Sequence, residues 1–181
     1  MLKLGKYEFD EDLEKSSLTV YIGDRKNGSE WSIDCAFLKS VYEGESASPQ
    51  IIINNIHTKK YDIRKFAGET FSTRNVAESD QREDSFYLFE HEPFIKMKVK
   101  IVAVEGGRAH ITCRGTAVED GYASPVKAVK FTGDCWLPLV VKGLDMSGYG
   151  GALNGLSENQ KVVGIHGFNR ILLWHHQGGC F

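Results

Sequence analysis

The stretch from residue 95 to residue 118 constrains this chain most, because its apolar residues alternate on both sides of a glycine pair. It reads IKMKVKIVAVEGGRAHITCRGTAV. Alternation with a period of two is typical of a β-strand with one buried face. A short glycine-containing loop between two such runs is typical of a hairpin. We therefore predict an antiparallel hairpin in this stretch.

Two loop lengths are possible in this hairpin, and they give different pairings. A two-residue loop at Gly106-Gly107 would place Ile101 opposite Thr112, so that an apolar face meets a polar one. A three-residue loop that also includes Glu105 places Ile101 opposite Ile111. Because burial of like with like sets the register of a half-buried hairpin, we predict the three-residue loop. This register directs four side chains inward: Val99, Ile101, Ile111 and Cys113.

Other short β-like runs occur along the chain. Residues 17–23 are rich in β-formers, and Asn27-Gly28 is typical of a tight hairpin turn. The alternation then continues through the inward-facing set Trp31, Ile33, Cys35 and Phe37. Further strands are predicted at 50–56, 59–66, 69–73, 85–93, 126–131 and 135–141, the last at a sheet edge or strand start because it contains Pro138. Residues 74–84 are polar and compatible with a helical turn, but they favour an exposed loop.

These elements indicate the fold class. No long, periodic helix is evident, which disfavours alternating strand–helix architectures. We predict a mainly β fold, either an antiparallel β-sandwich or a partly open β-barrel, with little helix. Residues 1–142 would form the β-rich core, and the glycine-rich loop and terminal β-like segment at 143–181 would belong to the same domain.

Composition limits the classes of partner. The 181 residues carry a net charge of −2, so no strong global field favours nucleic acid or an anionic membrane. No targeting segment or membrane span is evident. We therefore expect a cytoplasmic protein with no membrane partner and with reduced thiols. The four cysteines form no C-x-x-C pair, and Cys35 and Cys113 are expected to be buried small hydrophobes.

The final eight residues, WHHQGGCF, are the most chemically suggestive stretch. Adjacent residues of a strand face opposite sides, so His175 and His176 could not hold one ion from the same strand. The two glycines before Cys180 favour mobility over a rigid set of ligands. We predict that this stretch is neither a metal site nor a catalytic site, and we assign no metal and no cofactor to the chain.

Motifs for catalysis are incomplete. DMSGYGG lacks the first glycine of G-x-S-x-G. Glu90 and Glu92 could lie about 7 Å apart on one strand face, a spacing close to that of glycosidase carboxylates. A hydrolase or sugar-acting enzyme that uses Glu90, Glu92 and a histidine such as His110 is therefore an alternative. The sequence favours a protein without catalytic residues.

The outward face of the hairpin is basic. The predicted register places Arg114 on the same face as the lysines of the preceding strand, and Lys127 and Lys130 follow on a nearby strand. The candidate ligand-binding residues are Lys96, Lys98, Lys100, Arg114 and His110. A protein or a small anionic ligand is the expected partner. Nucleic acid is disfavoured, because no aromatic residue is interleaved with the lysines.

These observations favour a non-enzymatic, β-rich binding module, such as an inhibitor- or antitoxin-like protein. Besides the enzyme, a second alternative to the binding module is a structural or assembly subunit, in which residues 143–181 add a strand to a neighbouring chain. The sequence is compatible with a monomer or a homodimer.

Overall fold

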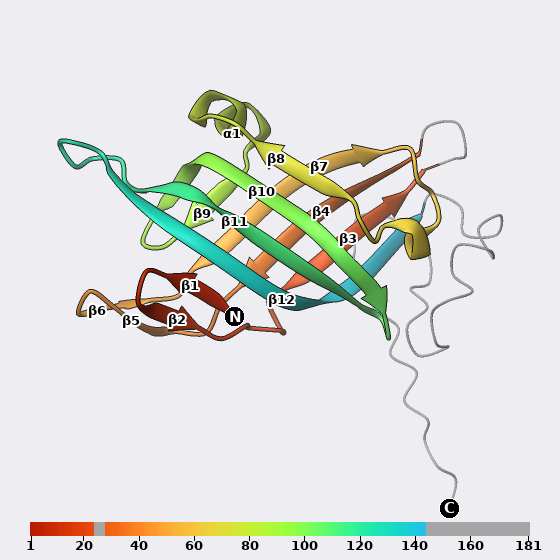
Figure 1. Cartoon of the computed structure of the whole chain (residues 1–181), viewed down its shortest axis with the longest axis horizontal. Helices are drawn as coiled ribbons and strands as arrows, with labels where there is room; N and C mark the ends of the chain where they lie inside the picture. Colours follow the sequence, from red (N-terminus) through yellow and green to blue (C-terminus); the bar gives the residue numbers. More distant parts are fainter. Residues whose placement is uncertain (24–27, 144–181) are drawn as a thin grey trace, which may run out of the picture.

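A computed structural model describes residues 1–23 and 28–143, and its fold is mainly β, as predicted (Figure 1). Seven strands pair in a continuous ring and close a barrel. In spatial order, the ring contains β3 (Ser17–Ile22), β4 (Ser29–Ala36), β7 (Gln50–Thr58), β9 (Ser85–Tyr87), β10 (His91–Glu105), β11 (Arg108–Asp120) and β12 (Lys127–Gly143).

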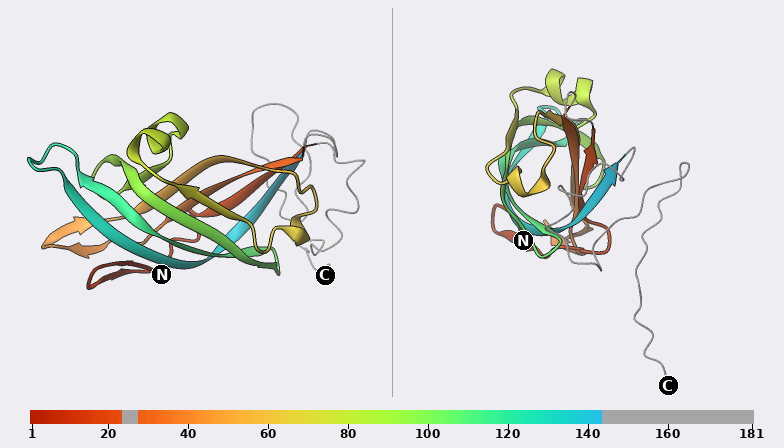
Figure 2. Two further views of the ribbon diagram at one scale, coloured as in Figure 1. Left: turned by 45° about the horizontal axis from the view of Figure 1, so that its top comes forward. Right: turned by 90° about the vertical axis from the view of Figure 1, so that its right-hand side faces the viewer.

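The prediction of a sandwich or a partly open barrel is met in part, because the chain forms a barrel and this barrel is closed. Strand β12 completes the ring, because it pairs with β11 on one side and with β3 on the other. Its pairing with β3 is parallel, from Leu139 opposite Leu18 to Gly143 opposite Ile22, so the barrel is not purely antiparallel. Parallel neighbours need a long connection, and here the intervening chain runs around the whole barrel. An end-on view shows the strands surrounding the interior (Figure 2).

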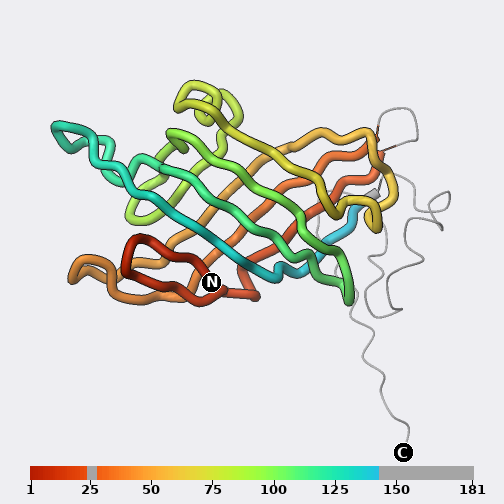
Figure 3. Tube along the Cα trace, viewed as in Figure 1, coloured from red at the N-terminus to blue at the C-terminus, as the bar shows by residue number. Residues whose placement is uncertain are grey.

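Smaller elements attach to this barrel. Strand β1 (Leu2–Leu4) pairs with the middle of β12 and with β2 (Tyr7–Phe9). Strand β8 (Thr70–Thr73) pairs with β10. A separate hairpin of β5 (Ser40–Tyr42) and β6 (Glu45–Ala47) lies beside the β1–β2 hairpin (Figure 3).

The central hairpin has the predicted facing but a different loop. Ile101 pairs with Ile111 and is fully buried, as predicted, whereas the predicted three-residue loop is wrong. The turn consists of Gly106 and Gly107, both with positive φ, as a tight two-residue turn requires. A bulge at Val102 adds one residue to β10. Inward side chains of β10 therefore still lie opposite inward side chains of β11.

Strand β12 joins two segments that the sequence analysis separated. Pro138 lies at the point where β12 changes neighbours: it is opposite Arg108 at the start of β11, and pairing with β3 begins at Leu139. A proline cannot donate a backbone hydrogen bond, but here the Leu139 amide donates to the Gly107 carbonyl at 2.9 Å. The strand therefore continues through the proline.

Two other predictions near residues 59–84 are wrong. Helix α1 (Val76–Arg82) replaces the expected loop, and a 3-10 turn (Ile63–Lys65) replaces part of an expected strand. The Asn75 side chain accepts a hydrogen bond from the Glu78 amide, while the Glu78 carboxylate accepts one from the Arg74 amide. This arrangement resembles a capping box, which stabilises a helix start.

Large apolar side chains fill the barrel interior. Trp31, Phe86 and Phe94 are fully buried, and Phe131 stacks on Phe86 at 5.5 Å between ring centroids. The predicted inward set is confirmed, since Trp31, Ile33 and Cys35 on β4 and Phe37 directly after it are each 0% exposed. Within the described ranges, no helix is long and apolar enough to cross a membrane.

Some predictions fall outside the described residues. The predicted Asn27-Gly28 turn falls partly on residues 24–27, which lie outside the described ranges. The strands before and after it, β3 and β4, pair antiparallel. Residues 144–181, with His175, His176 and Cys180, also lie outside, so the assignments made to that segment stay predictions.

Candidate anion-binding face

The outer wall formed by β10, β11 and β12 carries a concentration of positive charge. Inward positions of β10 hold the buried Met97, Val99 and Ile101, so the alternating positions point outward and are occupied by exposed lysines. Arg114 and Lys130 are exposed at outward positions of β11 and β12. We call this group the cationic face: Lys96, Lys98, Lys100, Arg114 and Lys130.

The strand register arranges these residues in rows across the wall. One row contains Lys96, Thr116 and Lys130, and the next contains Ser72, Lys98, Arg114 and Thr132. Paired strands lie about 5 Å apart, and same-face residues of one strand are about 7 Å apart. The five cations therefore form a two-dimensional array. The structure brings together four of the five predicted site residues, all except His110, in this array.

The charges of the cationic face are not neutralised within the described part of the chain. None of the five side chains takes part in an ion pair there, whereas Lys3, Lys15 and Lys60 each pair with a carboxylate at 2.7–2.9 Å. Lys98 and Arg114 are directly opposite one another, and like charges in that position are destabilising. The cationic face thus retains a repulsion that an external anion would relieve.

Hydroxyl groups surround the cations. The row next to Arg114 contains Thr70, Lys100, Thr112 and Asp134, and Ser72 and Thr132 flank the central row. Hydroxyls can donate hydrogen bonds to carboxylates or phosphates. The wall therefore offers both charge and directional donors to an anion.

Charge is distributed unequally around the barrel. Outward positions on β4 carry Glu30, Ser32 and Asp34, so that wall is polar to acidic. With a net charge of −2 for the whole chain, the basic character is local to the β10–β12 wall. An acidic partner would therefore be attracted to one side of the molecule.

His110 lies on the same wall but already has partners. Its Nε2 is 2.8 Å from an Asp134 carboxylate oxygen, and its ring stacks on Trp136 at 4.8 Å with an interplanar angle of 11°. Only 21% of the His110 side chain is exposed. His110 therefore borders the cationic face and is not one of its free cations.

Lys127 belongs to a different cluster. Its Nζ is 2.7 Å from carboxylate oxygens of both Glu43 and Glu119, and Tyr42 donates to Glu119 at 3.1 Å. Hydrogen bonds to Glu119 and Glu43 raise the pKa of Lys127, while burial and the Glu119 charge raise the pKa of Tyr42. This network connects the β5–β6 hairpin to the end of the β11–β12 ladder. Lys127 is charged and already paired with Glu43 and Glu119.

The carboxylates of the enzyme alternative do not converge. Glu90 lies outside the strands, so it does not share a strand face with Glu92. The Glu92 carboxylate accepts a hydrogen bond from the Gly121 amide at 2.8 Å. His110 is opposite Ala103, eleven residues further along β10, which corresponds to on the order of 30 Å of strand.

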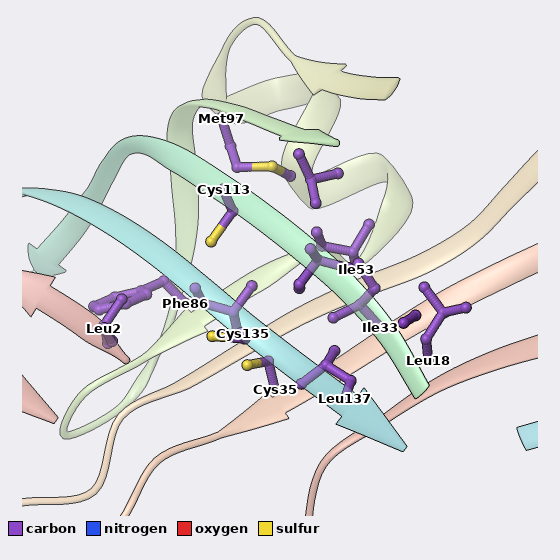
Figure 4. Packing of buried hydrophobic residues seen from close by; sticks show 14 of the residues in the cluster. Leu2, Leu18, Ile33, Cys35, Ile53, Phe86, Met97, Cys113, Cys135 and Leu137 are labelled. Carbon is purple, nitrogen blue, oxygen red and sulfur yellow. The ribbon is translucent and has the colours of Figure 1, made fainter. Parts of the chain in front are cut away.

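Three thiols meet in the barrel interior, which the sequence analysis did not foresee. Cys35, Cys113 and Cys135 come from three strands, and the sulfurs of Cys35 and Cys135 point toward one another (Figure 4). Burial raises the pKa of Cys113 to about 12, so its thiol is protonated near neutral pH. Within the described residues, no group of three or more His, Cys, Asp and Glu side chains is arranged to hold a metal ion.

Comparisons of the chain with known protein families, with curated proteins and with solved structures give no match.

Proposed function

We propose that this chain is a non-enzymatic binding module whose cationic face docks onto an acidic surface of a partner protein. The observation that carries the proposal is the array of five exposed cations without ion pairs in the described part of the chain. Such an array lacks an internal role, since the direct opposition of Lys98 and Arg114 opposes folding.

The shape of the array supports a protein partner over a small anion. The cations extend over three strands on the outer wall of a closed barrel, so a small anion would contact only a few of them. A partner surface with several carboxylates could contact all five at once. Electrostatic complementarity of this kind mainly accelerates encounter and selects the correct partner.

The composition of the array disfavours nucleic acid. Proteins that bind single strands combine basic grooves with aromatic platforms on which bases stack. The row of Lys96 has only Thr116 besides its cations. The row of Lys98 and Arg114 has Ser72 and Thr132 beside them, followed by the paired Lys3 and Glu8 of β1 and β2. Among the described residues, no aromatic side chain is interleaved in either row.

The test is binding of fluorescently labelled poly-L-glutamate, measured by anisotropy at 50 mM and 500 mM salt. We expect the affinity to fall with salt, because screening shortens to a few Å at high ionic strength. The triple variant Lys96→Ser, Lys98→Ser, Lys100→Ser should lose about ten- to thirtyfold, since three exposed pairs near the middle of the range of roughly 0.2–1 kcal/mol together contribute about 1.5–2 kcal/mol.

The matched control removes the same charge elsewhere. Lys39, Lys59 and Lys65 are also exposed and without an ion pair in the described ranges, but they lie off the β10–β12 wall. Their triple serine variant should bind within about threefold of the wild type. Equal losses in both triple variants, or tighter binding of an oligothymidylate than of polyglutamate, would overturn the proposal.

A further inference from the structure

The cationic face is continuous with a small apolar area on the same wall. Beyond the row of Lys100, Thr112 and Asp134, the next row contains Ala103, His110 and Trp136. The bulge adds Val102, which is 38% exposed. We call these four residues the aromatic strip: Val102, Ala103, His110 and Trp136.

The aromatic strip is held in a defined geometry. The His110 ring lies nearly parallel to the Trp136 ring at 4.8 Å, and Asp134 holds the edge of the imidazole at 2.8 Å. Tryptophan is enriched among the residues that dominate binding energy, and a fixed platform loses little conformational entropy on binding. The Asp134 carboxylate beside the strip is 69% exposed, so the strip suits an apolar group of the partner better than another carboxylate.

We propose that the acidic partner carries a large apolar side chain next to its carboxylates, and that this side chain seats on the aromatic strip. This inference rests on the proposed function, because the cationic face supplies the other half of the contact. Charged rows beside an apolar area match the usual anatomy of an interface, in which an apolar centre is flanked by polar groups.

The register also gives the spacing that the partner must have. Arg114 and His110 lie four residues apart on β11, which corresponds to about 13 Å along an extended strand. An extended peptide that runs along β11 would therefore place its apolar residue about four positions from the carboxylate that pairs with Arg114.

The experiment compares two labelled peptides, acetyl-EEEEGL-amide and acetyl-EEEEGA-amide, which have the same charge. The wild type should prefer the leucine peptide by about five- to tenfold, as partial burial of a leucine side chain predicts. The preference should persist at 500 mM salt, even as both affinities fall. The variants Val102→Ser and Trp136→Ser should each reduce this preference for the leucine peptide to below about twofold.

Val102→Ser keeps the test decisive if Trp136→Ser destabilises the barrel, because Val102 is an exposed bulge residue. Equal affinity of the wild type for the two peptides, with binding still lost in the lysine triple variant, would overturn the apolar contact and leave the proposed function standing. A wild type that binds neither these peptides nor polyglutamate would overturn both.

Discussion

Deleting Val102 should leave the barrel folded, although it removes a residue from the middle of its longest hairpin. Val102 is the extra residue of a bulge, so Ala103 pairs with His110 and Ile101 pairs with Ile111. Without Val102, Ala103 would directly follow Ile101 in β10, and Ile101 would still be opposite Ile111. Every side chain of β10 would keep its present face, and the ladder would become regular.

The expected cost of this deletion is small. Val102 is 38% exposed, so its loss sacrifices only part of the roughly 1.5–3 kcal/mol of a fully buried valine. Repairing the ladder offsets some of that loss. We expect the free energy of unfolding to change by no more than about 1.5 kcal/mol.

Deletion of Thr112 is the matched control on the opposing strand. Strand β11 pairs on both sides and has no bulge between His110 and Arg114. Without Thr112, Ile111 and Cys113 would be adjacent, and one of them would face outward. Exposing Ile111 costs about 1.5–3 kcal/mol, and turning His110 inward adds a desolvation cost of about 1–3 kcal/mol.

Urea titrations of the wild type and both deletions, followed by far-ultraviolet circular dichroism, measure the difference. The Thr112 deletion should lose about 2.5–6 kcal/mol, a large share of the roughly 5–15 kcal/mol typical of a domain. The reasoning about the bulge would be refuted if the Val102 deletion destabilised the protein as much as the Thr112 deletion does.

Three further predictions concern single side chains. Ile101→Ala should cost about 2–5 kcal/mol in urea titration, because Ile101 is fully buried, whereas Lys98→Ala should be neutral or slightly stabilising because Lys98 is opposite Arg114; equal costs would contradict the facing of β10. Asn75→Ala should cost about 0.5–2 kcal/mol through loss of the cap of α1, and unchanged hydrogen exchange in α1 would contradict it. Burial raises the pKa of Cys113 to about 12, so its thiol should react with iodoacetamide at pH 8 only as fast as the protein opens. Rapid labelling of the native protein, measured by peptide mass spectrometry, would contradict its burial.

Local patterns were sufficient to predict which side chains face the interior. Period-two alternation identified Ile101 and Ile111 as buried, and with them the outward lysines. The same pattern could not identify the loop, because a three-residue loop and a two-residue turn with a bulge give the same facing. The start of α1 was readable in principle, since Asn75 and Glu78 have the spacing of a capping box.

Features that depend on distant pairings could not be predicted. Closure requires Leu139 to lie opposite Leu18, which are 121 residues apart by subtraction of their numbers, and no local signal specifies this pairing. The same holds for Lys127, whose partner Glu43 lies 84 residues away. The aromatic strip was missed because it needs both the bulge at Val102 and the pairing of His110 with Trp136.

The position of β12 in the chain also affects how the barrel forms during synthesis. Strand β12 supplies both closing ladders, so β3 and β11 have open edges toward it until residues 127–143 have left the ribosome. Unpaired strand edges are prone to incorrect pairing, and contacts between distant residues slow folding. The nascent chain therefore completes its barrel only after nearly all of the described residues have been made, and until then the edges of β3 and β11 are open to incorrect pairing.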